Sequence, residues 1–347
     1  MPDFQITRGR MGSEPVVTVS AAGTSTRIVL ALRGATLLSW QADGPAGPVQ
    51  LTDGYRDADE LLSQDGVRNG LLAPFPNRIA QGRYRFDGRE YDLLPGRRDR
   101  LIYHGFIRTA PFELVEATTT AGGAVLRLRT HIAPGRHLGY PFALDVQATY
   151  TIGRNTVDID IDAANTGSTP APYGAGWHPY FRLSRTVDDL TLQIPADTVI
   201  RTDDALIPLP GDTARTPVDQ LPLLDFRTPS QIGARVIDTC FTDLRLDDTG
   251  RAETVLADPT TGEQIRVWQN AGSMHVYTGD TLARNQRRSV ALEPVESITD
   301  AFNRDELASQ IHLEAGGKRQ FGFGVSYHTS AQAHEQAPSH REPGDRP

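Results

Sequence analysis

Residues 143–162 read ALDVQATYTIGRNTVDIDID, and this stretch decides the fold class. Its second part, residues 157–162, alternates strictly between an aliphatic residue and aspartate. A Gly-Arg-Asn turn at residues 153–155 separates it from another strand-like run at residues 143–152. Because successive side chains of a β-strand point to opposite faces, the alternation indicates a strand with one buried and one solvated face. We therefore predict two strands joined by a short turn.

The same signals continue along the chain. Residues 124–132 have the composition of a neighbouring strand, and short Val, Ile and Leu runs broken by glycine turns fill residues 16–40. Residues 82–94 alternate aromatic and charged residues around Asp87-Gly88, a favoured pair for a tight hairpin turn. Many strands with Gly- and Pro-rich turns predict an all-β fold, a large antiparallel β-sandwich.

Domain organisation is expected to be simple. The sequence contains no repeat of fixed period and no long linker, so we expect one β-sandwich domain over residues 1–329. Helical periodicity is scarce, with short helices expected at residues 57–63 and 300–309. Residues 330–347, SAQAHEQAPSHREPGDRP, are polar and Pro-rich, which predicts a disordered tail.

Composition excludes several classes of function. The formal net charge is −8 with both signs mixed, so no positive patch for a nucleic acid is expected. Lys318 is the only lysine and stands in an exposed-looking turn, which argues against Schiff-base chemistry. Cys240 is the only cysteine, so no disulfide framework or cysteine zinc cluster is expected. The sequence has neither an apolar leader nor a membrane-length apolar run, and we expect a cytoplasmic protein without a membrane partner.

We expect no cofactor and no metal. Phosphate-loop and dinucleotide fingerprints are absent from the sequence. Asp158, Asp160 and Asp162 resemble the start of a calcium loop, but its glycine at the sixth position and glutamate at the twelfth are missing. The alternation instead predicts these aspartates on the solvated face of a strand.

Two segments in the first third of the chain contain residues suited to a polar ligand. Residues 74–79, PFPNRI, include Asn77 and Arg78. Arg78 can form a fork of hydrogen bonds to sugar hydroxyls, or it can be an ordinary surface arginine. In residues 103–106, YHGF, His104 precedes a glycine among apolar neighbours. Taken alone, such a histidine is more often part of the core than a catalyst.

Two later segments contain a candidate acid and a candidate base. Residues 176–181, GWHPYF, surround His178 with aromatic rings, which suit the apolar faces of a pyranose. Partial burial can keep the pKa of this imidazole near neutrality. Residues 291–297, ALEPVES, bring Glu293 to a strand end where it can act as a base. For residues 176–181 the alternative is aromatic core packing with an incidental histidine. For Glu293 it is an ordinary exposed glutamate in a loop.

In this order, the segments resemble the aldose 1-epimerase (galactose mutarotase) family. The match extends over roughly residues 30–325 and consists of PNRIAQGRYRFDG, YHGF, YPFALDVQATYTI, VDIDIDAANTGSTPAPYGAGWHPYF, IDTCF, VYTGD and ALEPVESITDAFN. WHPYF and LEP are its most specific parts. The family fold is a large antiparallel β-sandwich, in which residues distant in sequence line one concave face.

The resemblance implies an isomerase that opens and recloses the ring of a monosaccharide such as glucose or galactose. His178 matches the family's general acid and Glu293 its general base. Glu296 is a competing carboxylate, but the family's glutamate precedes the proline. The family chemistry needs no cofactor, and we expect a monomer or a homodimer.

The resemblance also implies a set of substrate-binding residues. His104 matches the family's second active-site histidine, and Arg78 and Asp238 match substrate-binding positions. We place Asn77 and Trp177, their neighbours in PNRI and WHPYF, in the same substrate-binding set.

Two departures leave alternatives open. His275 stands where many members have glutamine, and its role is not assigned. Residues 104–108, HGFIR, resemble the related hexose-6-phosphate epimerases, so a phosphorylated sugar is the alternative substrate. A non-catalytic sugar-binding module on the same fold is the alternative from another class, although it has no need of an acid and a base. A retaining glycosidase is the alternative that we rank last, because it uses two carboxylates and the best candidate pair here is a histidine and a glutamate.

Overall fold

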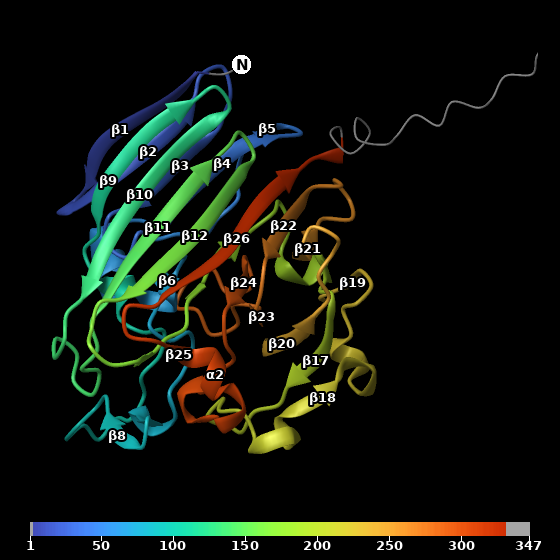
Figure 1. The fold of residues 1–347 in the computed structure, drawn as a ribbon. Helices are drawn as coiled ribbons and strands as arrows, with labels where there is room; N and C mark the ends of the chain where they lie inside the picture. Colours follow the sequence, from blue (N-terminus) through green and yellow to red (C-terminus); the bar gives the residue numbers. More distant parts are fainter. Residues whose placement is uncertain (1–2, 331–347) are drawn as a thin grey trace, which may run out of the picture.

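The computed structural model describes residues 3–330 of the 347-residue chain, and its front layer is a nine-stranded antiparallel sheet (Figure 1). In spatial order its strands are β19 (Ser230–Gln231), β16 (Thr191–Gln193), β21 (Ala252–Ala257), β22 (Gln264–Gln269), β26 (Lys318–His328), β12 (Thr156–Asn165), β11 (Leu144–Ile152), β10 (Gly123–Ile132) and β9 (Glu113–Thr120).

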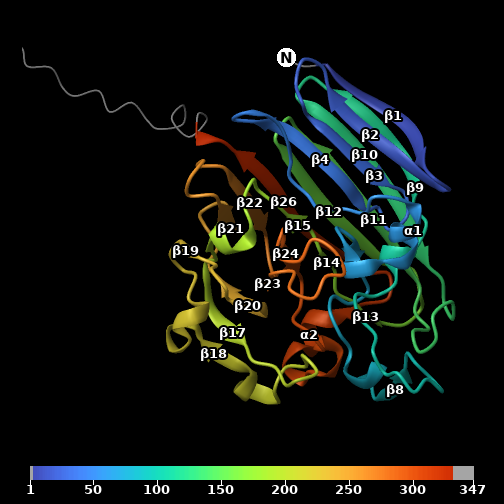
Figure 2. The same ribbon diagram turned by 180° about the vertical axis from the view of Figure 1, so that it is seen from behind.

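The second layer consists of two sheets that lie on the same face of the first (Figures 1 and 2). The five-stranded sheet contains β1 (Phe4–Met11), β2 (Glu14–Ala21), β3 (Arg27–Ala31), β4 (Leu37–Gly44) and β5 (Gly47–Gln50). The eight-stranded sheet has the order β18 (Arg215–Pro217), β17 (Ala196–Ile200), β20 (Asp238–Leu244), β23 (Ser273–Tyr277), β24 (Val290–Val295), β14 (Gly176–Trp177) and β6 (Leu71–Leu72), and β15 (Tyr180–Phe181) also pairs with β24. Between the layers, one hydrophobic core includes Trp40, Ile159 and Leu292, so all three sheets share it.

The predicted strands are confirmed. β11 and β12 pair from Ile152 opposite Val157 across the expected turn, and the residues of β12 alternate between buried and partly exposed. The hairpin is β7 (Arg83–Phe86) with β8 (Arg89–Asp92). Asp87 and Gly88 between them both have positive φ, as a type I′ turn requires. A further short pair is β13 (Ala171–Pro172) with β25 (His312–Leu313). The all-β, antiparallel prediction is therefore correct.

The helices agree in part with the prediction. α1 (Ala58–Ser63) begins after Asp57, whose side chain accepts a hydrogen bond from the Glu60 N–H, as expected for a helix at 57–63. The helix predicted at 300–309 is wrong over most of its length. Extended backbone at Arg304 interrupts it. The segment consists of two 3₁₀ turns, η8 (Ala301–Asn303) and η9 (Asp305–Leu307), followed by α2 (Ala308–Ile311).

Other 3₁₀ turns connect the strands. They are η1 (Asp65–Val67), η2 (Ala80–Gly82), η3 (Ile107–Thr109), η4 (Val187–Asp189), η5 (Gly211–Ala214), η6 (Val218–Gln220) and η7 (Pro222–Leu224). Among residues 3–330, no helix has the length and apolar character needed to cross a bilayer. Residues 331–347 of the predicted tail lie outside the described residues, and the single domain over 1–329 stays a prediction.

Candidate active site

Strand register brings three titratable side chains to one face of the eight-stranded sheet. His275 at the centre of β23 lies opposite Cys240 on β20 and opposite Glu293 on β24. Residues directly opposite each other on antiparallel strands point to the same face. Asp238 is two residues from Cys240 and so joins the same face. The sheet thus groups Asp238, His275 and Glu293, which are far apart in the sequence.

These side chains line a cleft of about 250 Å³. The remaining lining comes from η1, from the segment before β7, from the segment after β8, from β14–β15 and from the loop after β23: Asp65, Gly66, Val67, Asn77, Arg78, Tyr103, His104, His178, Tyr180, Tyr277, Thr281 and Leu282. A larger hollow of about 510 Å³ lies around Phe106 and His137, but the carboxylate in its lining, Glu113, is exposed. The cleft therefore brings buried acid and base groups together beside open space.

His178 and Glu293 form a direct pair inside the cleft. Nε2 of His178 lies 3.3 Å from Oε1 of Glu293, and their side chains are 8% and 2% exposed. Nδ1 of His178 and Oε2 of Glu293 have no hydrogen-bond partner among the described residues. Both atoms are themselves buried, so within residues 3–330 the pair retains one unsatisfied polar atom on each residue.

Burial controls the protonation of this pair. Burial raises the pKa of Glu293 to about 8, with Asp238 acting in the same direction and His275 and Arg78 opposing it. Burial, together with the charge of His275, lowers the pKa of His178 to about 3. Two interacting groups release their protons in two steps that belong to the pair. Between these steps, over the neutral range, the pair holds one proton.

Asn69 fixes the segment that carries His178. Its backbone N–H donates to the His178 carbonyl (2.9 Å), and its side-chain oxygen accepts from the Tyr180 N–H (2.7 Å). Its side-chain NH₂ donates to the Leu37 carbonyl (2.8 Å), and its own carbonyl accepts from the indole of Trp177 (3.2 Å). Asn69 is fully buried and has φ of 57°, a conformation that asparagine tolerates well. No local sequence pattern marks Asn69 as a residue of the site.

Trp177 is the predicted site residue that the structure does not bring to the cleft. Its indole is fully buried and stacks on Phe323, with ring centroids 5.6 Å apart. Neighbouring residues of a strand point to opposite faces, so Trp177 faces the core where His178 faces the cleft. We therefore remove Trp177 from the substrate-binding set. Tyr180 stacks on His178 (5.0 Å between centroids) and lines the cleft instead.

His104, Asn77 and Arg78 form the neighbouring wall. Nδ1 of His104 accepts a hydrogen bond from the Asn77 N–H (3.2 Å), and Arg78 donates to the Asn77 side-chain oxygen (3.0 Å). Burial holds the pKa of His104 well below its usual value, so the ring is neutral. With Nδ1 accepting, the ring proton lies on Nε2, which makes His104 a hydrogen-bond donor. Its ring meets that of His178 edge to face, with centroids 5.0 Å apart.

Asp238 and His275 form a second pair. Nε2 of His275 donates to Oδ1 of Asp238 at 2.8 Å. Burial alone would raise the pKa of Asp238, but the hydrogen bond and charge of His275 lower it. Asp238 therefore lies in the cleft as a carboxylate.

Glu296, the competing carboxylate, is absent from the lining of the cleft. Its Oε2 accepts a hydrogen bond from the Ala175 N–H at 2.8 Å, and burial raises the pKa of this carboxyl to about 7. The Glu296 side chain therefore serves as hydrogen-bond acceptor for the backbone N–H of Ala175, just before β14.

Comparisons with known proteins identify the family of this chain. The sequence profile described as aldose 1-epimerase matches residues 15–326. The chain belongs to the aldose 1-epimerase family. It is thus an isomerase of the mutarotase type. YihR, an uncharacterized protein of Escherichia coli, is 30% identical to it over 258 residues, which cover 74% of this chain and 77% of that protein.

Two further relatives extend the comparison. Human galactose mutarotase is 29% identical over 189 residues, 53% of this chain and 52% of that protein, so the chain spans about half the length of this relative. The crystal structure of galactose 1-epimerase from Lactobacillus acidophilus superposes with a TM-score of 0.79 over 95% of this chain and 99% of that one, at 17% identity. This last likeness concerns the fold alone.

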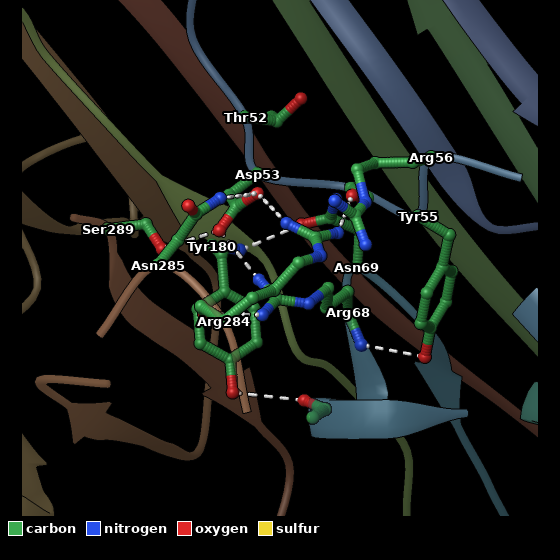
Figure 3. Close-up of polar contacts among 12 residues, drawn as sticks. Thr52, Asp53, Tyr55, Arg56, Arg68, Asn69, Tyr180, Arg284, Asn285 and Ser289 are labelled. Carbon is green, nitrogen blue, oxygen red and sulfur yellow. Dashed lines mark hydrogen bonds and ion pairs between the residues drawn. The ribbon is translucent and has the colours of Figure 1, made fainter. Parts of the chain in front are cut away.

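A buried ion-pair network supports one side of the cleft (Figure 3). The Asp53 carboxylate binds Arg68 through one oxygen (2.6 Å) and Arg284 through the other (2.8 Å). Arg68 directly follows η1, and Arg284 lies two residues after Leu282, so both lining segments share this anchor. Arg284 also binds the Glu60 carboxylate of α1.

We expect Arg284→Gln to loosen this side of the cleft while the fold persists. Asp53 keeps Arg68 as its partner, so no buried charge is left unpaired. The lost charged hydrogen bonds should reduce the free energy of unfolding by about 2 kcal/mol. KM for a sugar should rise roughly tenfold with a smaller change in kcat, because Thr281 and Leu282 lose their anchor.

Denaturant unfolding and steady-state kinetics measure the two effects. Arg245→Gln is the matched control, since Arg245 pairs with Asp197 on the exposed surface and its loss should cost under about 1 kcal/mol. Equal KM values for wild type and Arg284→Gln would contradict the anchoring role.

Proposed function

We propose that this protein interconverts the α and β anomers of an unphosphorylated aldohexose, with His178 as general acid and Glu293 as general base. The observation that carries the proposal is the buried contact of 3.3 Å between Nε2 of His178 and Oε1 of Glu293 in the wall of the cleft. Anomer exchange requires one proton to leave the anomeric hydroxyl and another to reach the ring oxygen of the same sugar. A pair that holds one proton in the neutral range can do both.

The proton balance of the reaction closes within the pair. In the resting pair the proton lies on Glu293, because the pKa of Glu293 is raised to about 8 and that of His178 is lowered to about 3. In the reactive form this proton has moved across the 3.3 Å contact to His178, which leaves Glu293 as a carboxylate. Glu293 takes the proton of the anomeric hydroxyl while His178 protonates the ring oxygen, and the bond between the anomeric carbon and the ring oxygen breaks to give the aldehyde. After rotation about the first carbon–carbon bond, His178 takes back its proton as the hydroxyl attacks the other face, and Glu293 protonates the carbonyl oxygen. The pair ends with one proton, as it began.

The other cleft residues have binding roles in this proposal. The Nε2–H of neutral His104 can donate to a sugar oxygen near the ring, and Arg78 can donate through its guanidinium. The Asp238 carboxylate can accept from a hydroxyl, and Asn77 holds both Arg78 and His104 in place. This set offers donors and acceptors to hydroxyl groups on one side of a pyranose.

Charge in the cleft favours a neutral sugar over a hexose 6-phosphate. Its lining includes the carboxyl groups of Asp65, Asp238 and Glu293, and its cationic groups are the guanidinium of Arg78 and the imidazolium of His275, which already binds Asp238. A phosphate group usually requires several cationic donors. A non-catalytic sugar-binding module is disfavoured because it gains nothing from a buried acid–base pair. The cytoplasmic location and the monomeric or homodimeric state remain predictions.

Polarimetry of freshly dissolved sugars tests the function. We expect the rotation of α-glucose or α-galactose to reach equilibrium faster with protein than in buffer, also with excess chelator and no added nucleotide. A glucose 6-phosphate arm tests the alternative, and its acceleration should weaken as salt rises if the phosphate is bound electrostatically. Decay of the optical rotation at the buffer rate for every sugar would refute the proposal. Acceleration confined to glucose 6-phosphate would mean that the substrate is a hexose 6-phosphate and not an unphosphorylated aldohexose.

A further inference from the structure

His275 lines the cleft, yet the proton cycle of His178 and Glu293 does not use it. We propose that His275 is a positioning residue whose imidazolium orients the Asp238 carboxylate and stabilises the carboxylate form of Glu293. The inference rests on the proposed function for its kinetic meaning, but it concerns contacts that exist in the free protein.

The geometry supports both parts of this role. His275 is 7% exposed at the centre of β23, with β20 on one side and β24 on the other. Its Nε2 donates to Oδ1 of Asp238 at 2.8 Å, which leaves the second oxygen of that carboxylate for a ligand. Glu293 is its direct partner on β24, where opposite Cβ atoms are about 4.5–5.5 Å apart. One ring therefore acts on a binding carboxylate and on the base.

The groups that face His275 favour its charged form. They come from β20, from β24, from the segment after β14 and from the segment after β8: Asp238, Cys240, Glu293, His178 and His104. Burial lowers the pKa of His275, but the hydrogen bonds to Asp238 and Cys240 and the carboxylate of Glu293 raise it well above the usual value. His178 and His104 are neutral by comparison, because burial and neighbouring positive charge lower the pKa of each ring.

A fixed positive charge at His275 weakens proton binding by the catalytic pair. It opposes the rise in the pKa of Glu293 that burial causes, and it adds to the fall in the pKa of His178. The pair therefore resists taking up a second proton as the pH falls. Glutamine at this position can donate a hydrogen bond to Asp238 but cannot supply the charge. The two parts of the role can thus be separated by substitution.

The test compares His275→Gln and His275→Leu with wild type. The Glu293 carboxyl is titrated in the free protein by carbon-13 NMR, its signal being assigned by its loss in Glu293→Gln. In both variants the apparent pKa of Glu293 should rise by about one unit, the effect of one nearby charge. The alkaline limb of kcat/KM should move by the same amount. KM should stay near wild type in His275→Gln and rise severalfold in His275→Leu, which also loses the bond to Asp238.

The matched control is His131→Gln, because His131 forms an exposed pair with Asp145 (2.7 Å) on the nine-stranded sheet and should leave the Glu293 titration unchanged. An unchanged Glu293 titration in His275→Gln would overturn the inference even with an active enzyme. A shifted titration in a protein that accelerates no anomer exchange would refute the proposed function and leave the electrostatic assignment standing.

Discussion

Glu293→Gln should lower kcat for mutarotation by about 10²–10⁴-fold while sugar binding survives. The amide keeps the size of the side chain but cannot take the proton of the anomeric hydroxyl. The fold should not suffer, because burial already raises the pKa of Glu293 to about 8 and so disfavours its charged form. Above its unfolded pKa such a group makes the folded state less stable as pH rises. At pH 8 the variant should therefore melt at the wild-type temperature or above.

Glu296→Gln is the matched control for this substitution. It is three residues away and partly buried, and the glutamine oxygen can still accept from the Ala175 N–H, so its kinetics should remain near wild type. Stopped polarimetry gives kcat, and titration calorimetry gives sugar affinity. An active Glu293→Gln with an inactive Glu296→Gln would move the base to Glu296. Normal rates in both variants would remove the mechanism.

His178→Asn should lower kcat to a similar extent, because the ring oxygen then leaves without a proton. The backbone around it should hold, since the His178 carbonyl and N–H bind Asn69 and Gly70 and do not depend on the imidazole. His178 and Glu293 pass one proton between them, so the double variant should be little slower than the slower single variant.

The same polarimetric assay measures kcat for His178→Asn, Glu293→Gln and the double variant. Far-UV circular dichroism checks that each is folded. If the loss of kcat in the double variant equalled the product of the two single losses, the two residues would act independently. That result would contradict the shared proton.

Local patterns were sufficient to predict the fold class, whereas the site residues were proposed from the family resemblance. The alternation at 157–162 has a period of two, and a strand is the element with that period, so β12 followed from the sequence alone. The family resemblance then named His178, Glu293, His104, Arg78, Asp238 and Asn77, and the structure brings all of them to one cleft.

The remaining features depend on pairing between distant segments. Only the register of β20, β23 and β24 reveals that His275 lies between Asp238 and Glu293. Asn69 holds the segment of His178 through bonds to residues more than a hundred positions away, which leave no local pattern. One error was avoidable. Trp177 and His178 are neighbours in an extended segment, so their side chains cannot both face the cleft.

The pH dependence of kcat/KM between pH 5 and pH 10, corrected for the buffer-catalysed rate, tests the central claim that the His178–Glu293 pair works with one shared proton. Because the upper pKa of the pair is about 8, we predict a plateau through neutral pH and a fall above about pH 8, when the last proton leaves and no acid remains. The fall should approach tenfold per pH unit. A value of kcat/KM that stays constant or rises up to pH 10 would contradict the shared-proton mechanism.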